Sequence, residues 1–368
     1  MGQDTLWVGL DTDKKHIDVA VAEPLPGGEV RYLGQIAADP ASLDRVIKRL
    51  RRDDRKLVVC YEAGPCGYGI YRQLNDKPGV TCHVIAPSMT PRRAGVRVKT
   101  NRRDSMTLAR LLRAEELTAV WVPDPAHEAM RDLVRARGRA VEALMRCRQH
   151  IGGFLLRQDV RYIGAPWTKK HRAWLGQLEF AHPAHRLMFG ELLDALDQAQ
   201  ARRDRLTDHI AELTPQWSLA WLVEALQVLR GYRLINAATV AAEIGDPRRF
   251  DKPRELMGFL GMVPSERSTG DSVRRGGITK AGNGRARRAL IEAAWTYARP
   301  AKAPAPTGHS AALREIADKA RHRLGARYRK LTARGKLPQV AVTAIARESI
   351  GFIWAIAHAA APKPPRRG

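Results

Sequence analysis

Three acidic side chains are spaced along the first third of the 368-residue chain as a metal-dependent phosphoryl-transfer site requires. Asp11 and Glu62 each follow an apolar run and are 51 residues apart, and Asp104 stands 42 residues beyond Glu62. Two-metal phosphoryl transfer needs hard oxygen ligands that hold Mg²⁺ or Mn²⁺ ions roughly 4 Å apart, and carboxylates supply them. Each acid alone is typical of a turn or a helix cap. The combination predicts a metal site.

The elements around these acids are those of an α/β domain, which we expect to cover residues 1–122. Apolar or alternating runs predict strands at residues 6–10, 17–21, 56–61 and 81–85. Apolar residues at helical spacing predict helices at residues 41–50, 68–74 and 105–115. The spacing of the acids is what a ribonuclease-H-like (RuvC-like) sheet needs to bring a first-strand Asp, a fourth-strand Glu and a later helix Asp to one edge.

Charge indicates the kind of partner. Lys and Arg number 63 against 38 Asp and Glu, a net charge of +25. Such an excess favours a nucleic acid over a merely solvated basic surface, because each cation placed on a phosphate releases condensed counterions. Residues 251–368 hold 24 Lys and Arg against 8 Asp and Glu, a net +16, so we expect the main nucleic-acid footprint there.

A glycine-rich basic loop is predicted at residues 270–284. Its glycines would let backbone amides approach phosphates, and a helix from Arg285 would offer its N-terminus to an anion. A flexible basic surface loop is the alternative. No helix carries the Asn, Gln and Arg pattern of groove reading. The candidate contact residues are Lys99, Arg102, Arg103, Arg267, Arg274, Arg275, Lys280, Arg285, Arg287 and Arg288.

The middle of the chain, residues 123–222, is predicted to be helical. One apolar stripe runs over residues 133–155 and is interrupted at Gly152 and Gly153. A second stripe repeats every three or four residues from Leu192 to Leu213, with Arg203 on the seam, as in a coiled coil. An intramolecular helical hairpin and a dimerisation arm are equally consistent with this pattern.

The last third is expected to be mainly helical. Apolar spacing predicts helices at residues 223–228, 237–244, 254–260, 285–297, 311–331 (one helix or a pair) and 340–359. The composition of residues 300–306 predicts a linker, which separates a domain at residues 223–300 from a basic helical extension at 301–359. Residues 360–368 are predicted to be a disordered tail.

The cysteines and the apolar segments indicate the compartment. Four cysteines in a chain of this length, without a metal-binding spacing, predict reduced thiols. No signal segment or run of eighteen apolar residues is present, and the apolar stretch at 350–361 is too short to span a bilayer. We therefore expect a soluble cytoplasmic protein without a membrane partner.

Three N-terminal segments carry a resemblance to a known family: residues 9–15 (GLDTDKK), 60–68 (CYEAGPCGY) and 98–105 (VKTNRRDS). The C-terminal segments at 256–270 (LMGFLGMVPSERSTG) and 276–283 (GGITKAGN) match equally well. Together they resemble the DEDD-class insertion-sequence transposases, the bridge-RNA-guided recombinases, most closely the branch with subterminal inverted repeats. The resemblance covers nearly the whole chain.

The resemblance implies four metal-site positions, which fall on Asp11, Glu62, residue 101 and Asp104. Residue 101 is Asn101, where the family has Asp. An amide oxygen can coordinate Mg²⁺ but adds no charge, so metal should be held less tightly than by four acids. Asp13 and Asp18 are nearby acids, which we expect in a surface turn and on the solvent face of a strand, respectively.

The resemblance also implies a serine nucleophile in the C-terminal domain that forms a covalent link to DNA. The matching loop offers Ser268, with Thr269 as the alternative. The implied partners are DNA, a guide RNA and further copies of the chain in a dimer or tetramer, in a bacterial cytoplasm at the nucleoid. Two other functions compete with a recombinase: a Holliday-junction-type resolvase that uses water as nucleophile, and an inactive nucleic-acid-binding protein, which Asn101 favours.

Overall fold

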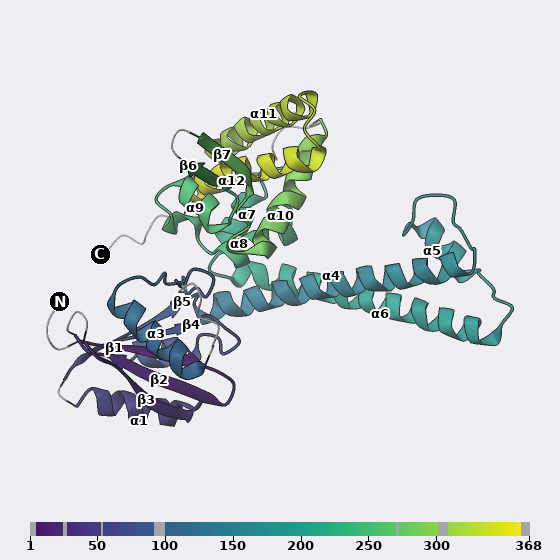
Figure 1. Ribbon diagram of the computed structural model, residues 1–368. Helices are drawn as coiled ribbons and strands as arrows, with labels where there is room; N and C mark the ends of the chain where they lie inside the picture. Colours follow the sequence, from purple (N-terminus) through teal and green to yellow (C-terminus); the bar gives the residue numbers. More distant parts are fainter. Residues whose placement is uncertain are drawn as a thin grey trace. The chain divides into compact units, whose positions relative to one another are not determined.

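The computed structural model describes residues 5–24, 28–52, 54–91, 100–269, 272–300 and 308–361 (Figure 1). The chain divides into two compact units, Met1–Val122 (unit 1) and Pro123–Gly368 (unit 2). Unit 1 is a mixed α/β unit and unit 2 is mostly helical, in agreement with the predicted classes.

Unit 1 is built on a five-stranded sheet of order β3-β2-β1-β4-β5. The strands are β1 (Thr5–Thr12), β2 (His16–Ala22), β3 (Val30–Ala37), β4 (Lys56–Glu62) and β5 (Val80–Ile85). β1, β2 and β3 pair in antiparallel fashion, while β4 runs parallel to both β1 and β5. β3 was not predicted, because Arg31, Gly34 and Gln35 break its apolar alternation.

The helices of unit 1 cover the two faces of this sheet. They are α1 (Pro40–Leu50), α2 (Gly69–Asn75) and α3 (Asn101–Arg113). Because side chains alternate along a strand, Val8 and Leu10 of β1 face α1 and α2, while Trp7 faces the side that α3 covers. α3 begins at Asn101, four residues before the predicted start, so Asn101 and Asp104 both lie in its first turn.

Two long antiparallel helices open unit 2. α4 (Pro125–Arg157) and α6 (Pro183–Leu213) lie side by side, and α5 (Lys169–Gly176) lies at the far end of the pair (Figure 1). Seam residues of α6 pack within the chain, since Leu196 and Ile210 are 2% and 0% exposed. This is the intramolecular hairpin alternative. Gly152 and Gly153, which interrupt the apolar stripe, do not interrupt the helix, because α4 continues to Arg157.

The remaining helices of unit 2 pack around one apolar core. They are α7 (Ala220–Leu226), α8 (Leu234–Ile244), α9 (Pro253–Phe259), α10 (Gly284–Ala294), α11 (Ala311–Ala333) and α12 (Pro338–Ala360). α11 is a single helix rather than a pair. The predicted linker lies almost wholly, and the predicted tail mostly, outside the described residues.

An antiparallel hairpin is formed by β6 (Pro264–Thr269) and β7 (Ser272–Ile278), and β7 lies within the predicted glycine-rich loop. The prediction of a loop over 270–284 was therefore wrong for residues 272–278. Gly276 and Gly277 suggested a loop, but the residues before them, Val273 to Arg275, pair with β6. Both faces of the hairpin are exposed along nearly its whole length.

α12 has the length and apolar composition of a membrane span, and it is the one such helix among the described residues. The apolar stretch at 350–361 was expected to be too short to cross a bilayer, but the whole helix is longer than this stretch, so its length does not exclude a membrane span. Half of its apolar window is buried within the protein. Val342, Ile345 and Ile350 are fully buried in the core of unit 2. This packing is typical of a core helix.

Candidate functional site

Asp11 and Glu62 end two neighbouring parallel strands at the same level. Leu10 of β1 pairs with Tyr61 of β4, so the following residues, Asp11 and Glu62, are also level. Both lie on the face that α3 covers, because Gly9, two residues before Asp11, contacts that helix. Both side chains are partly exposed. The predicted meeting of these two acids at one sheet edge is observed.

Gly9 allows α3 to approach the sheet closely. A Cβ atom at this position would lie 2.3 Å from the carbonyl oxygen of Ser105 and 2.4 Å from the backbone nitrogen of Ala109. On the adjacent strand, the Cys60 thiol donates to the carbonyl of Leu108 at 3.8 Å. The backbone of α3 therefore lies directly on β1 and β4.

The direction of α3 places Asp104 at the same edge as Asp11 and Glu62. At the C-terminal end of α3, Arg113 Nη1 donates to the carbonyls of Glu23 and Gly28, each at 3.0 Å, at the opposite end of the sheet. The first turn of α3 therefore lies toward Asp11. Thr100 caps this turn by accepting a hydrogen bond from the Arg103 backbone at 3.3 Å.

Asp18 is a further acid at this edge, and its expected position on a solvent face was wrong. It stands directly opposite Asp11 in the β1–β2 register and is 3% exposed. Asp18 accepts hydrogen bonds from the Tyr32 hydroxyl at 2.5 Å and from Gln35 Nε2 at 3.1 Å. The small residues Ala20 and Ala22 share the face of Asp18 and admit α3, and this explains the burial.

Asp13 occupies a surface turn as expected. Its Oδ1 atom accepts from the backbone nitrogens of Lys15 at 2.7 Å and His16 at 2.8 Å. These hydrogen bonds lower the pKa of Asp13. The carboxylate therefore stabilises the turn between β1 and β2 and faces away from the acids.

The acids share one edge, but their donor atoms do not converge. Among the described residues, no three His, Cys, Asp or Glu side chains are placed so that they could hold a metal ion. Glu62 accepts from the Thr90 hydroxyl at 3.2 Å, and Asn101 is exposed in the first turn of α3. The donor chemistry, carboxylate oxygens beside one amide, is nevertheless that of a Mg²⁺ or Mn²⁺ site.

The β6–β7 hairpin places Ser268 and Thr269 on opposite faces. Ser268 pairs with Val273, and Thr269 pairs with Ser272. Because cross-strand partners share a face and neighbours alternate, the Ser268 face also carries Glu266 and its partner Arg275. The Ser268 hydroxyl donates to Glu266 Oε1 at 2.8 Å, and Arg275 Nε lies 3.3 Å from Glu266 Oε2.

The opposite face of the hairpin carries two like charges. Arg267 and Arg274 are direct cross-strand partners on the side of Thr269. Like charges in this position repel each other and destabilise a ribbon, unless an anion lies between or beside them. This face therefore suits a phosphate group.

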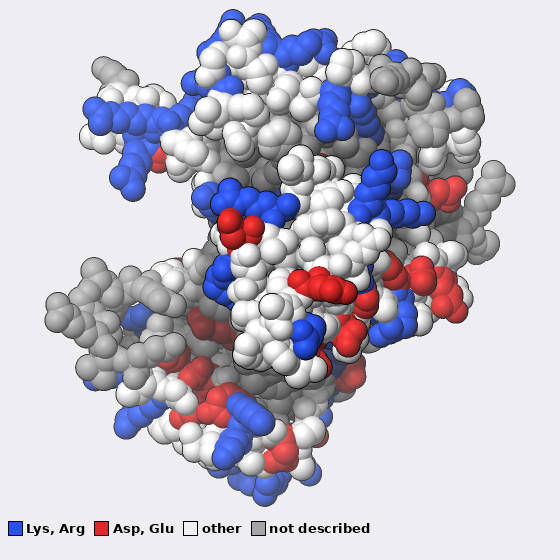
Figure 2. Space-filling model, turned by 90° about the vertical axis from the view of Figure 1, so that its right-hand side faces the viewer, with Lys and Arg blue, Asp and Glu red and all other residues white. Residues whose placement is uncertain are grey.

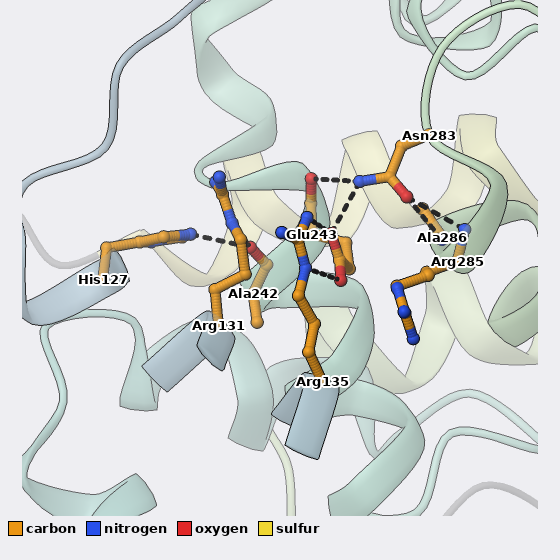
Figure 3. A network of polar contacts seen from close by, with 8 residues as sticks. All are labelled: His127, Arg131, Arg135, Ala242, Glu243, Asn283, Arg285 and Ala286. Atoms are coloured by element: carbon orange, nitrogen blue, oxygen red, sulfur yellow. Dashed lines mark hydrogen bonds and ion pairs between the residues drawn. The ribbon is translucent and has the colours of Figure 1, made fainter. Parts of the chain in front are cut away.

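A buried polar network fixes the segment that follows the hairpin (Figure 3). The Glu243 side chain of α8 is fully buried and accepts two hydrogen bonds, each of 2.8 Å, from Arg135 of α4. Asn283 Nδ2 donates to the same carboxylate at 2.6 Å. Asn283 Oδ1 in turn caps α10 by accepting from the backbone of Arg285 at 3.0 Å and Ala286 at 3.1 Å.

The same network extends along α4. His127 Nε2 and Arg131 Nε donate to the carbonyl of Ala242 at 2.8 and 2.9 Å (Figure 3). Burial lowers the pKa of His127, so its ring is neutral with the proton on Nε2. Burial opposes the charge of Glu243, but Arg135 and Asn283 outweigh it, so the pKa of this carboxyl lies below its usual range.

Several of the predicted nucleic-acid contacts have partners within the protein. Arg287 Nη1 donates to the carbonyls of Leu260, at 3.0 Å, and Ala281. Arg288 lies 3.3 Å from Glu142, Arg275 contacts Glu266, and Arg102 stacks on the Tyr32 ring at 5.2 Å. Lys99 lies outside the described residues. The residues whose binding role remains a prediction are Arg102, Arg103, Arg267, Arg274, Arg275, Lys280, Arg285, Arg287 and Arg288.

Sequence reasoning assigned Asp18 to a solvent face and gave no role to Glu266 and Glu243. Two of them had a signal in the sequence. Alanines two and four positions after Asp18 indicate a strand face that admits a helix, and Glu266 stands two residues from Ser268, which places both on one face of any strand. Glu243 had none, because its partner Arg135 is 108 residues away.

Comparison with known proteins gives consistent matches. Residues 223–307 match the family described as "Transposase IS116/IS110/IS902 family", and residues 8–158 match the IS110 DEDD transposase family. A putative transposase of Sinorhizobium fredii is 50% identical over 96% of this chain and 89% of its own length. The transposase for insertion sequence element IS1533 of Leptospira borgpetersenii is 28% identical over 90% of this chain and 98% of its own length.

Replacing Gly9 by Ala should destabilise unit 1. The new Cβ would overlap the backbone of α3, so helix and sheet must separate, and overpacking of this kind costs about 1–3 kcal/mol. Urea denaturation measures the loss. Gly69→Ala is the matched control, since a Cβ there meets nothing within 4 Å. Equal stabilities of the two variants would contradict the close approach.

Replacing Glu243 by Ala should destabilise unit 2 by about 1–3 kcal/mol, because Asn283 and the side chain of Arg135, which is 34% exposed, lose their shared acceptor. The depressed pKa means that this stabilisation is present above the unfolded value near 4.5 and is lost as the pH falls through the folded value. Thermal unfolding at several pH values measures both effects. Glu142→Ala, which removes the exposed partner of Arg288, should cost about 1 kcal/mol or less.

Proposed function

Because this chain belongs to the IS116/IS110/IS902 family of transposases, its activity is DNA transposition, and we propose how its own residues carry out the strand cleavage and exchange. In this proposal, Asp11, Glu62 and Asp104 hold divalent metal ions and Ser268 attacks the DNA phosphate. The observation that supports it is the shared sheet edge, at which β1, β4 and the first turn of α3 each carry one of the three acids.

The sheet supports a ribonuclease-H-like assignment. Its order β3-β2-β1-β4-β5, with three antiparallel strands followed by two parallel ones, puts the Asp of β1 beside the Glu of β4. When bound, Mg²⁺ or Mn²⁺ would stabilise negative charge on the phosphate oxygens. Asn101 can add one neutral oxygen from the same turn as Asp104. Asp18, opposite Asp11, adds a fourth carboxyl group to the edge.

Ser268 supports a covalent mechanism through its position. It lies on an exposed strand of unit 2, next to Arg275 on the same face, where an incoming phosphate can reach both groups. A covalent intermediate conserves the energy of the cleaved phosphodiester for rejoining. Thr269 is the alternative nucleophile, and it shares the opposite face of the hairpin with Arg267 and Arg274. The acids belong to unit 1 and the serine to unit 2, so we propose a composite site whose halves come from different copies of the chain.

The positive charge supports binding of two nucleic acids, a DNA and a guide RNA. In Figure 2 blue Lys and Arg side chains predominate over the part of unit 2 that carries the C-terminal helices. A charge of +25 exceeds what a few phosphate contacts on a short duplex require. The seam of the α4–α6 hairpin is used within the chain, so our candidate for the contact between copies is its outer surface, where Met145, Leu156 and Leu187 are exposed.

Replacing Ser268 by Ala should abolish a covalent protein–DNA band on a denaturing gel after incubation with DNA that carries the element ends and Mg²⁺. Thr269→Val is the control and should keep the band, because Thr269 lies on the other face. Asp104→Ala should lose both cleavage and the band. Free nicked ends that persist in Ser268→Ala would instead indicate a nuclease that uses water. Absence of cleavage by the unaltered protein would indicate a binding protein.

Replacing Arg274 by Gln should weaken DNA binding in a salt-dependent way. Each phosphate contact contributes about 0.9 to the slope of log affinity against log salt concentration, so the slope should fall by about that amount. Fluorescence anisotropy at several salt concentrations measures it. Arg45→Gln, on α1 of unit 1, is the control and should leave the slope unchanged. Equal slopes for both variants would remove Arg274 from the interface.

A further inference from the structure

We propose that Glu266 is a catalytic residue that orients the Ser268 hydroxyl and accepts its proton during strand cleavage. This inference rests on the proposed role of Ser268 as nucleophile. The observation behind it is the 2.8 Å hydrogen bond that the Ser268 hydroxyl donates to Glu266 Oε1. Among the described residues of β6 and β7, no other side chain forms a hydrogen bond with this hydroxyl.

The strand geometry holds the two side chains together. Residues two apart on a strand project from the same face, so Glu266 and Ser268 are neighbours as long as β6 keeps its extended form. Arg275 is the cross-strand partner of Glu266 and contacts the other carboxylate oxygen, Oε2, at 3.3 Å. Oε1 is thereby left directed toward Ser268.

Stability does not explain this arrangement. The side chains of Arg275 and Glu266 are 68% and 48% exposed, and ion pairs this exposed contribute about 1 kcal/mol or less. Almost all side chains of the hairpin are exposed, so their order along the strands contributes little to a buried core. The arrangement instead matches what a hydroxyl nucleophile needs in order to attack a phosphate. The carboxylate can act as the base, the cation can stabilise the charge on the phosphate, and the open face gives the phosphate access to the hydroxyl.

The proposed cleavage step moves one proton to Glu266 and another to the departing sugar oxygen. The Ser268 Oγ–P bond forms while the bond from phosphorus to a sugar oxygen breaks. The Ser268 proton passes to Glu266, and the departing sugar oxygen takes a proton from water. On rejoining, a sugar hydroxyl attacks phosphorus and gives its proton to water, the Oγ–P bond breaks, and Glu266 returns its proton to Ser268. A carboxylate that accepts a hydroxyl proton has the same task in protein kinases.

The charge state of Glu266 suits this task. The hydrogen bond from Ser268 and the contact with Arg275 lower the pKa of Glu266, so the carboxylate is ionised at neutral pH, although the same contacts make it a weaker base than an isolated glutamate. Among the described residues of β6 and β7, the charged group that faces Glu266 is Arg275, whereas Arg267 and Arg274 lie on the other face. Thr269 shares that other face, so Glu266 favours Ser268 as the nucleophile.

The test measures the rate of covalent complex formation in a single turnover, with the full-length protein, its co-purifying RNA, Mg²⁺ and duplex DNA that carries the element end. Glu266→Gln should lower this rate by about 10²–10⁴-fold, because the amide can orient the hydroxyl but cannot take its proton. Glu315→Gln is the matched control, since Glu315 is an exposed acid paired with Lys319 on α11, and its rate should equal that of the unaltered protein.

A second pair of variants separates proton transfer from a structural role. A thiol loses its proton far more readily than a hydroxyl, so in a Ser268→Cys background the further change Glu266→Gln should have an effect of less than about tenfold. A large effect in both backgrounds would show that Glu266 only shapes the hairpin and would overturn the proposal. An unchanged rate in Glu266→Gln, with the band still lost in Ser268→Ala, would overturn the role of Glu266 alone. A band that persists in Ser268→Ala would overturn both proposals.

Discussion

The arrangement of the acids in unit 1 depends on the contact between the backbone of α3 and the backbone of β1 at Gly9. A single Cβ atom there would fall within 2.4 Å of two backbone atoms of the helix, so no rearrangement of side chains could accommodate it. The small side chains of Ala20 and Ala22 on β2 and of Cys60 on β4 lie on the same face and leave room for α3. The first turn of α3, which carries Asp104 and Asn101, is consequently held against the ends of the strands.

A second constraint organises unit 2, and it is electrostatic rather than steric. The buried carboxylate of Glu243 joins Arg135 of the long helix α4 to Asn283, the residue that caps α10. A buried charge of this kind is costly unless its partners are in place, so the three elements are stable only in one relative position. The hairpin that carries Ser268 lies in the chain between α9 and α10, and Arg287 of α10 donates to the carbonyl of Leu260 after α9, so the two ends of the hairpin segment are joined.

Sequence patterns predicted those features that depend on local periodicity. The alternation around Asp11 and Glu62 gave the correct strands, and the parallel register then follows from one β1–β4 pairing. Patterns failed where distant residues decide the outcome. Asp18 has the polar character of a solvent-facing position, yet α3, eighty residues away, covers it. The hairpin was predicted as a loop because its glycines and exposed faces carry no apolar alternation, and cross-strand pairs such as Glu266 with Arg275 hold it instead.

The two sets of proposed chemical groups have opposite mechanical requirements. Metal-binding acids must keep their spacing within a fraction of an ångström, and a close-packed sheet and helix provide this rigidity. A nucleophile that becomes bonded to DNA must reach a phosphate on a large, stiff duplex, and a ribbon exposed on both faces provides this access. In the proposed composite site, the acids of one copy of the chain and the serine of another must meet on the DNA. Cleavage would then depend on assembly, and this limits cutting at sites where only one copy of the protein is bound.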